Sequence, residues 1–311
     1  MCGLFGFINY SGDKIKDLQK LTNYLAREST IRGTDATGIA FNHSGGINIV
    51  KDNKSAFKID FKHADDIKSL IGHTRHGTHG GNSVKEAHPY LGKCRNLKFS
   101  LAHNGVLNNF RELRRTLNLP KTTINVDSYI AIQLLEYKGY LDFDSLKFMA
   151  EQVNGSFSFS ILDDKNNIYL VKGDSPLSIL HFPKLKIYVY ASTDEILYKA
   201  IVDYPLIFSE LKNGEHEKIS ISEGDILKIR PDGIIEKSTF EYNTYYGRDW
   251  WYYGSYSLLS TENDVKGYTK NDYIEDLKSV ACFQGFSSEI VDDLINNGFT
   301  LEEIEDYIYE F

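Results

Sequence analysis

Over residues 1–240, short apolar runs alternate with segments in which apolar residues recur at helical spacing. The apolar runs predict β-strands, and those between residues 156 and 191 follow one another as closely as in an antiparallel sheet. The predicted strands are 4–8, 37–41, 47–50, 70–74, 99–103, 156–162, 168–172, 177–180, 186–191, 219–230 and 234–237. The predicted helices are 15–26, with Asp13 as a candidate cap, 128–137, 142–152, and 194–201, with Ser192 or Thr193 as its cap.

The character of the sequence changes at Glu241. Residues 241–269 are crowded with Tyr and Trp and are typical of a linker or a docking segment. Three further helices are predicted at 272–282, 288–296 and 301–309, separated by Gly-Phe-Ser and Gly-Phe-Thr. We therefore expect a large domain at 2–240, an aromatic linker at 241–269 and a small acidic helical region at 270–311. The helical region has a faint similarity to ubiquitin-associated three-helix bundles; the alternative is a small lid packed on the large domain.

Charge is unevenly distributed along the 311 residues, whose formal net charge is −8. Residues 271–311 hold eleven Asp or Glu and one Lys, so the rest of the chain is close to neutral. Such a balance argues against a nucleic-acid-binding protein, which would present a basic face. The sequence has no apolar run long enough to span a membrane and no signal-peptide pattern. With only three cysteines, we expect a cytoplasmic protein without disulfides, in which Cys2 is a free thiol.

Cys2 is the first candidate for chemistry. Removal of Met1 would leave a thiol and an α-amine on the same residue. The amine has a reference pKa of about 7.7–8.0, so it is suited to accept the thiol proton and later to protonate a leaving amine. On its own, however, a cysteine in second position is weak evidence for a nucleophile.

A series of short motifs strengthens this interpretation. They are Cys2–Ile8, Arg32–Ile39, Gly72–Gly80, Ala87–Pro89, Ala102–Asn109, Asn125–Ser128, Gly173–Leu177 and Ala191–Asp194. In their order and separation they resemble the motifs of class II glutamine amidotransferases, such as the glutaminase domains of glucosamine-6-phosphate synthase and amidophosphoribosyltransferase. The resemblance covers residues 2–240. It implies an α+β fold, the four-layer αββα sandwich of N-terminal-nucleophile hydrolases.

The resemblance also implies roles for individual residues. Cys2 would attack the side-chain amide of L-glutamine, while the amide of Asn104 and the backbone N–H of Gly105 would stabilise the oxyanion. Arg75 would bind the α-carboxylate of glutamine, because a guanidinium pairs with a carboxylate through two parallel hydrogen bonds. Asp127 would bind the α-ammonium group; its structural alternative is an N-cap at the helix that follows.

The loop after Arg75 departs from the family. Thr78 and His79 would shape the substrate pocket there, but His76 stands where the family has Trp or Tyr, and Gly77 replaces an alanine. This pair would affect how the loop closes over glutamine. The histidines along this part of the sequence also suggest a metal site, but nearby glycines argue against a helix that would align them, and the expected zinc cysteines are missing. We therefore expect no metal and no cofactor.

Three functions follow as hypotheses. The leading one is a glutaminase that releases glutamate and ammonia through a γ-glutamyl thioester and passes the ammonia to a separate acceptor synthetase, because the 70 residues after the large domain are too few for a synthase domain. The second is hydrolysis of another γ-glutamyl amide, such as glutathione or a γ-glutamyl peptide. The third is a non-catalytic binding module on the same scaffold.

Overall fold

A computed structural model describes residues 2–12, 15–77, 83–95, 97–124, 126–242, 270–283, 286–301, 304, 307 and 308. The chain divides into two compact units, residues 1–242 and 243–311. Each unit has a hydrophobic core of its own.

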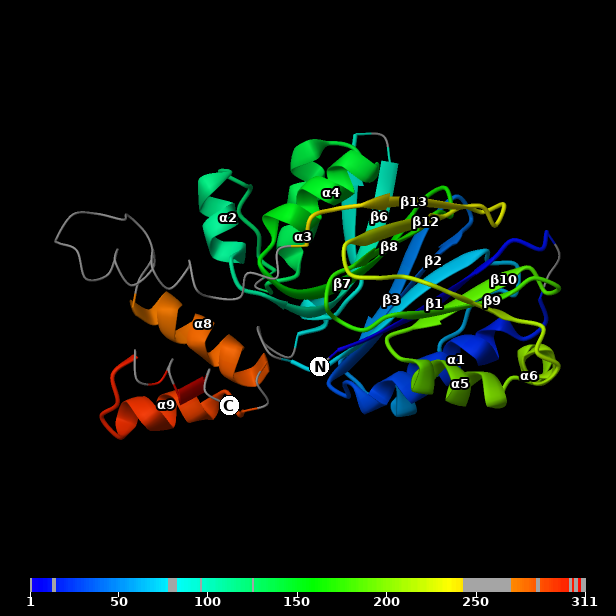
Figure 1. The fold of residues 1–311 in the computed structure, drawn as a ribbon. Coiled ribbons are helices and arrows are strands. Elements are labelled where there is room, and N and C mark those ends of the chain that lie inside the picture. The colour runs from blue at the N-terminus through cyan, green and yellow to red at the C-terminus, as the bar shows by residue number, and fades with distance from the viewer. Residues whose placement is uncertain are drawn as a thin grey trace. The chain divides into compact units, whose positions relative to one another are not determined.

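Two antiparallel sheets form the centre of the first unit (Figure 1). In the described residues the first sheet has seven strands, in the order β11-β9-β10-β1-β4-β2-β3. Its strands are β1 (Gly3–Asn9), β2 (Ala36–His43), β3 (Gly46–Asp52), β4 (Ser69–Arg75), β9 (Ser178–Phe182), β10 (Ile187–Ala191) and β11 (Glu217–Ile219). The second sheet has six described strands, in the order β13-β12-β8-β7-β6-β5. Its strands are β5 (Tyr90–Cys94), β6 (Leu97–Leu107), β7 (Gly155–Asp163), β8 (Ile168–Lys172), β12 (Asp225–Ile229) and β13 (Ile235–Thr239).

Helices cover the outer face of each sheet, as Figure 1 shows. The first sheet packs against α1 (Leu18–Glu28), α5 (Asp194–Val202) and α6 (Pro205–Lys212). The second sheet packs against α2 (Phe110–Thr116), α3 (Tyr129–Lys138) and α4 (Phe143–Gln152). The described residues also form the single-turn 3₁₀ helices η1 (Ser29–Ile31), η2 (Ala56–Lys58) and η3 (Val84–Glu86).

The alternation of side chains along β1 explains how the layers hold together. Phe5 and Phe7 are buried in the core beneath the helices, whereas Leu4 and Ile8 are buried in the core between the two sheets. Because successive side chains of a strand point to opposite faces, one apolar strand fills two cores. The predicted αββα sandwich is confirmed.

The structure corrects several predicted elements. The single strand predicted at 219–230 is wrong: β11 and β12 belong to different sheets. A turn separates them, in which Gly224 has a φ of 85° and the Ser222 N–H donates to the Asp225 carboxylate (2.7 Å). The sequence pattern also missed β5, α2 and α6. Helix α1 begins after Asp17, which has a left-handed φ of 63°, and the predicted cap Asp13 lies outside the described residues.

The second unit contains α8 (Lys270–Phe283) and α9 (Glu289–Asn296). Among its described residues, the buried apolar side chains are Leu277, Ala281, Val291, Ile304 and Ile308. Lys278 of α8 pairs with Asp292 of α9 at 2.8 Å. Most of the predicted linker, and much of the helix predicted at 301–309, lie outside the described residues.

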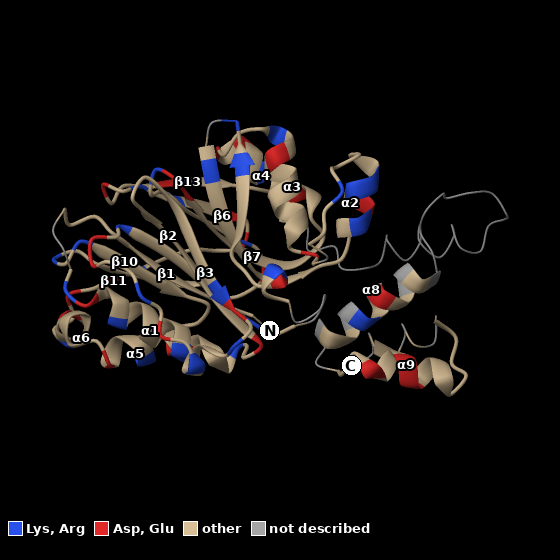
Figure 2. Cartoon of the chain, turned by 180° about the vertical axis from the view of Figure 1, so that it is seen from behind, with Lys and Arg blue, Asp and Glu red and all other residues tan. Residues whose placement is uncertain are grey.

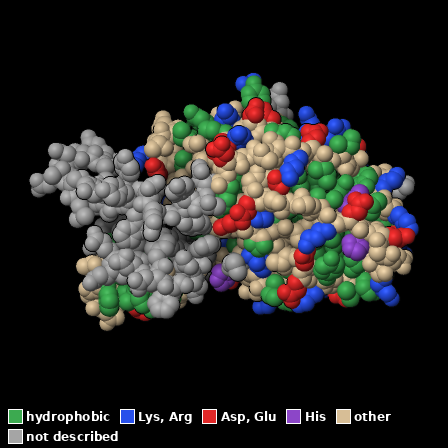
Figure 3. Space-filling model, in the orientation of Figure 1, with side chains coloured by type: hydrophobic (Ala, Val, Ile, Leu, Met, Phe, Trp, Pro, Cys, Tyr) green, Lys and Arg blue, Asp and Glu red, His purple; other side chains and the backbone are tan. Residues whose placement is uncertain are grey.

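Charged residues of both signs are interspersed over the first unit, whereas those marked on α9 are acidic (Figure 2). Figure 3 shows the same mixture on one face of the first unit, where Lys and Arg lie beside Asp and Glu. Within the part of the chain that the structure describes, no helix combines the length and the apolar character needed to cross a membrane.

Candidate active site

Cys2 immediately precedes β1, the strand at the middle of the first sheet. Its carbonyl oxygen accepts a hydrogen bond from Nε of Arg32 at 2.7 Å. Its Sγ lies 3.5 Å from the backbone nitrogen of His76, which donates to the sulfur, and 3.6 Å from the His76 carbonyl oxygen. The start of β1 is therefore held between the segment after η1 and the segment after β4.

The surroundings of the Cys2 thiol act on its pKa in opposite directions. Burial is the largest effect and raises the pKa, while the His76 N–H and the chain's amino terminus lower it. The negative charge of Asp127 raises the pKa further, and the positive charge of Arg75 lowers it. Since the net shift is upward, the neutral thiol is favoured, and a nucleophilic reaction at this sulfur needs a base nearby.

Arg75 ends β4 and is almost fully buried. Its carbonyl oxygen accepts from the Asp35 N–H at 3.0 Å. A side chain at Gly33 would overlap the Arg75 backbone, so only glycine permits this approach. The register pairs Gly3 with Thr74, which brings Cys2 beside the end of β4.

Asn104 and Gly105 lie on β6, opposite Ser158 and Phe157 of β7. The Asn104 side chain is 1% exposed, and its Nδ2 has no hydrogen-bond partner in the described part of the chain. Gly105 has a φ of 138°, and a Cβ there would overlap the carbonyl oxygen of Ser156. An amide donor buried without a partner is uncommon and calls for an explanation, such as a ligand that accepts from it.

Asp127 is buried between β6 and the start of α3. Its Oδ2 accepts from the Leu107 N–H at 2.7 Å, and its Oδ1 accepts from Oγ of Ser128 at 3.3 Å. The N-cap of α3 is Ser128. The interpretation of Asp127 as an N-cap is therefore wrong, because its carboxylate binds the β6 backbone instead.

The phenol of Tyr90, on β5, lies near Arg75, Asp127 and Cys2. Burial is the main cause that raises the pKa of its phenol; Arg75 lowers it, and Asp127 and Cys2 raise it. Electrostatic influence on a single phenol from all three groups requires that they lie near it. Tyr90 directly follows the Ala87–Pro89 motif but was not among the site residues predicted from the sequence.

Contacts among three buried histidines link β4 of the first sheet with β6 of the second. Nε2 of His73 lies 3.0 Å from the His103 carbonyl oxygen, and the His103 N–H donates to Nδ1 of His88 at 3.0 Å. The rings of His73 and His88 stack with centroids 4.2 Å apart. Because His103 precedes Asn104 and His73 is two residues from Arg75, these contacts bring the ends of β4 and β6 to the same part of the molecule. The described residues contain no cluster of three or more His, Cys, Asp or Glu arranged to hold a metal ion.

The loop after Arg75 is described only in part. Thr78 and His79 lie outside the described residues. His76 is more than half exposed, with Nδ1 4.0 Å from the Asp35 carboxylate, which also accepts from the Gly77 N–H at 2.7 Å. Asp35, for which the sequence predicted no role of its own, thus holds Gly77 by a hydrogen bond and lies close to His76.

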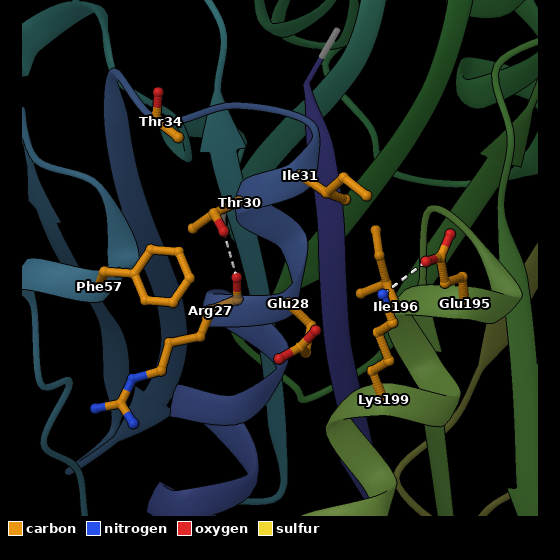
Figure 4. Close-up of a pocket in the computed structure, with 9 residues that line it drawn as sticks. All are labelled: Arg27, Glu28, Thr30, Ile31, Thr34, Phe57, Glu195, Ile196 and Lys199. Atoms are coloured by element: carbon orange, nitrogen blue, oxygen red, sulfur yellow. Dashed lines mark hydrogen bonds and ion pairs between the residues drawn. The ribbon is translucent and has the colours of Figure 1, made fainter.

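A hollow of about 280 Å³ lies elsewhere on the first unit, between the end of α1, η2 and the start of α5 (Figure 4). Phe57, Ile31 and Ile196 line it together with charged side chains, among which Lys199 pairs with Glu195 at 2.7 Å. None of the predicted site residues lines this hollow.

Comparison with protein families gives two matches in the first unit. A model described as class II glutamine amidotransferases matches residues 1–132. A second model, described as a glutamine amidotransferase domain, matches residues 74–199.

Individual relatives extend the similarity. A glutamine–fructose-6-phosphate aminotransferase (isomerizing) of Staphylococcus aureus is 32% identical over 257 residues, which cover 77% of this chain and 39% of the relative. Its counterpart in Staphylococcus epidermidis is 31% identical over 191 residues, 58% of this chain and 30% of the relative. The matched part thus spans well under half of these curated relatives.

Among solved structures, the glutamine phosphoribosylpyrophosphate amidotransferase of B. subtilis, complexed with ADP and GMP, has a similar fold. The TM-score is 0.62 at 20% identity, and the match covers 78% of this chain and 50% of that one. A structure titled as the allosteric regulatory enzyme of purine biosynthesis has a TM-score of 0.61 at 21% identity, with the same coverage of the two chains.

Proposed function

Since the chain belongs to the class II glutamine amidotransferases, we propose that it hydrolyses the side-chain amide of L-glutamine with Cys2 as an N-terminal nucleophile. The observation that supports this most directly is the grouping of Cys2 with Arg75 and Asp127, whose charges both act on the pKa of its thiol. A cation and an anion beside one nucleophile suit the α-carboxylate and the α-ammonium of an amino-acid substrate.

The proposed reaction begins once Met1 is removed. The freed α-amine of Cys2 takes the thiol proton, which burial otherwise retains on the sulfur by raising the thiol pKa. The sulfur then bonds to the carboxamide carbon, and the carbonyl electrons move to oxygen. Collapse of this intermediate breaks the C–N bond, and the leaving nitrogen takes the proton from the α-amine and departs as ammonia. Water then cleaves the γ-glutamyl thioester and gives glutamate.

Asn104 and Gly105 would stabilise the oxyanion in both steps. The unpartnered Nδ2 of Asn104 supports this role, because a donor that is already buried needs no reorganisation when the negative charge appears. The absence of a Cβ at Gly105 lets the backbone of β6 approach both β7 and a bound substrate. Thr78 and His79 would line the glutamine pocket from the loop after Arg75.

The ammonia would pass to an acceptor enzyme on a separate chain. The relatives named above are more than twice as long as their matched part, so they contain sequence that this match does not include. In this chain the first unit is followed by an acidic helical unit, and we propose that the acidic face of α9 docks on a basic surface of the acceptor.

The test combines intact mass with an assay of glutamate release from glutamine, glutathione and a γ-glutamyl peptide. We expect a mass that lacks Met1, turnover of glutamine, and labelling of Cys2 by a glutamine-like electrophile. Cys2→Ala should be inactive and unlabelled, whereas Cys282→Ala, a cysteine of the second unit, should behave as wild type.

Each alternative has its own result in the same test. Turnover of the γ-glutamyl peptide but not of glutamine would favour the second hydrolase. Absence of both labelling and turnover in the processed chain would favour the binding module. Full activity of Cys2→Ala would refute the proposed mechanism.

A further inference from the structure

Ser128 occupies the N-cap of α3 but does not act as a cap. Serine at this position ordinarily accepts a hydrogen bond from a backbone N–H in the first turn. Here the hydroxyl makes no such bond. It lies instead between two buried side chains, 2.9 Å from Nδ1 of His103 and 3.3 Å from Oδ1 of Asp127. All three residues are at most 5% exposed, so these contacts lie in the interior of the first unit.

The single hydroxyl hydrogen of Ser128 decides how the three groups are connected. If this hydrogen pointed to Nδ1 of His103, no hydrogen would lie between the Ser128 hydroxyl oxygen and the Asp127 carboxylate oxygen, and these two electron-rich atoms would repel each other. If Nδ1 carries the ring hydrogen, His103 donates to Ser128 and Ser128 donates to Asp127. The ring then loses only the 3.4 Å contact between Nε2 and the Ser156 carbonyl oxygen. A full carboxylate charge outweighs a distant carbonyl dipole, so the second arrangement is favoured.

His103 stays neutral in this chain of hydrogen bonds. Burial lowers its pKa, and this effect outweighs the charges of Asp127 and Asp174, which act to raise it. A neutral imidazole orients the Asp127 carboxylate without cancelling its charge. The other carboxylate oxygen is held by the Leu107 N–H at 2.7 Å, so donors fix both ends of the group.

We propose that Ser128 and His103 are positioning residues that fix the plane of the Asp127 carboxylate and thereby make the site select substrates with a free α-ammonium group. The inference rests on the proposed function, in which Asp127 receives that group. Loss of the Ser128 hydroxyl would let the carboxylate rotate and would weaken binding of the amine, while the sulfur and the oxyanion donors stay in place.

The experiment compares glutamine with glutaramate, which is glutamine without its α-amine, in wild type and three variants. Ser128→Ala should raise KM for glutamine about 10-fold, in the range expected for a weakened hydrogen bond to a charged group, and leave kcat nearly unchanged. The kcat/KM for glutaramate should not change; where its turnover is too slow to follow, its Ki as an inhibitor serves instead. Ser128→Thr keeps the hydroxyl and should restore the wild-type KM. Ser160→Ala, which removes a buried hydroxyl bonded to Tyr190, is the matched control. It should change neither the KM for glutamine nor the kcat/KM for glutaramate.

Two outcomes would overturn the proposal. One is an equal effect of Ser128→Ala on glutamine and glutaramate, or no effect on either. The other is protonation of His103 on Nε2 in wild type, observed by ¹⁵N NMR of the imidazoles. We expect instead that His103 carries its hydrogen on Nδ1 in wild type and on Nε2 in Ser128→Ala. If wild type does not hydrolyse glutamine, the proposed function fails, and the NMR measurement still decides whether the hydrogen-bond chain exists.

Discussion

Replacing Asn104 by alanine should have opposite consequences for catalysis and for stability. If Nδ2 donates to the oxyanion, its loss should lower kcat about 10²–10³-fold, equivalent to about 2.7–4 kcal/mol of transition-state stabilisation, with little change in KM. In the free protein, however, this amide donor is buried and has no partner in the described residues. A buried unsatisfied donor costs about 1–3 kcal/mol, so its removal should offset most or all of the packing lost with the side chain.

Asn23 provides the matched comparison. It is buried on α1, its Nδ2 donates to the carbonyl oxygens of Gln19 and Phe61 at 2.9 and 3.0 Å, and its Oδ1 accepts from the Phe61 N–H at 2.9 Å. Asn23→Ala removes all three bonds and leaves a buried N–H unpaired, which should cost about 2–3 kcal/mol of the free energy of unfolding at roughly 1 kcal/mol a bond. For a domain of this size that lowers Tm by about 4–12 °C.

The assay pairs steady-state glutaminase kinetics with thermal and chemical unfolding of the two variants. We expect Asn104→Ala to be stable and nearly inactive, and Asn23→Ala to be unstable and, at a temperature where it is folded, fully active. The reasoning would be refuted if Asn104→Ala kept kcat within about 10-fold of wild type, below the loss expected for an oxyanion donor. Equal destabilisation of the two variants would show that Nδ2 of Asn104 has a partner after all.

Three further predictions concern backbone, pH and docking. Gly105→Ala should destabilise the first unit by about 3 kcal/mol or more, because Gly105 has a positive φ and an added Cβ would overlap β7. Gly214→Ala, at a φ of 71° with open space around it, should cost only about 1 kcal/mol. Similar losses of the free energy of unfolding for the two variants, measured in urea, would contradict the overlap at Gly105. Burial lowers the pKa of the three clustered histidines, to about 3 for His73, so the unfolded state binds more protons below a pH of about 6.5. The free energy of unfolding should therefore have its full value above that pH and fall as pH decreases toward 3, by up to about 1.4 kcal/mol per pH unit for each histidine. Urea unfolding at pH 7.5, 6 and 5 measures this dependence. An unchanged free energy across the three pH values would show that the cluster takes up no protons on unfolding. Reversing the exposed charges Glu289 and Asp293 on α9 to lysine should abolish capture of the acceptor protein at low salt and leave glutaminase activity intact, and undiminished capture would remove the docking proposal.

The sequence determined the features that depend on neighbours along the chain. Strands β1, β8 and β10 were predictable because apolar residues or glycine fill nearly every position of a strand buried on both faces. In β7, Ser and Phe alternate, which is the two-residue period of a strand. Helix α5 was predictable from Thr193, whose hydroxyl accepts from the Ile196 N–H. The motifs also named the candidate residues Cys2, Arg75, Asn104, Gly105 and Asp127, but as separate segments whose grouping was only implied.

Elements with weak local signals escaped prediction. Helix α2 has seven residues, and its N-cap Asn109 makes no capping bond. Strand β5 alternates buried and exposed positions over only five residues, and a glycine and a lysine stand in the middle. In α6, Pro205 at the first position is typical of a helix start, but the spacing of the apolar residues did not predict a helix there. Short elements of this kind are stabilised mainly by the sheet or core that they pack against, and that information lies far away in the sequence.

Only the tertiary structure decided what each polar side chain does at the candidate site. Ser128 has the residue type and the position of a helix cap, yet its hydroxyl serves Asp127 because β6 brings His103 against it. Tyr90 joins the group because β5 pairs with the other edge of β6, opposite β7. A hydrogen bond forms with whichever partner the fold brings within about 3 Å, and strand pairing between residues far apart in sequence sets that distance.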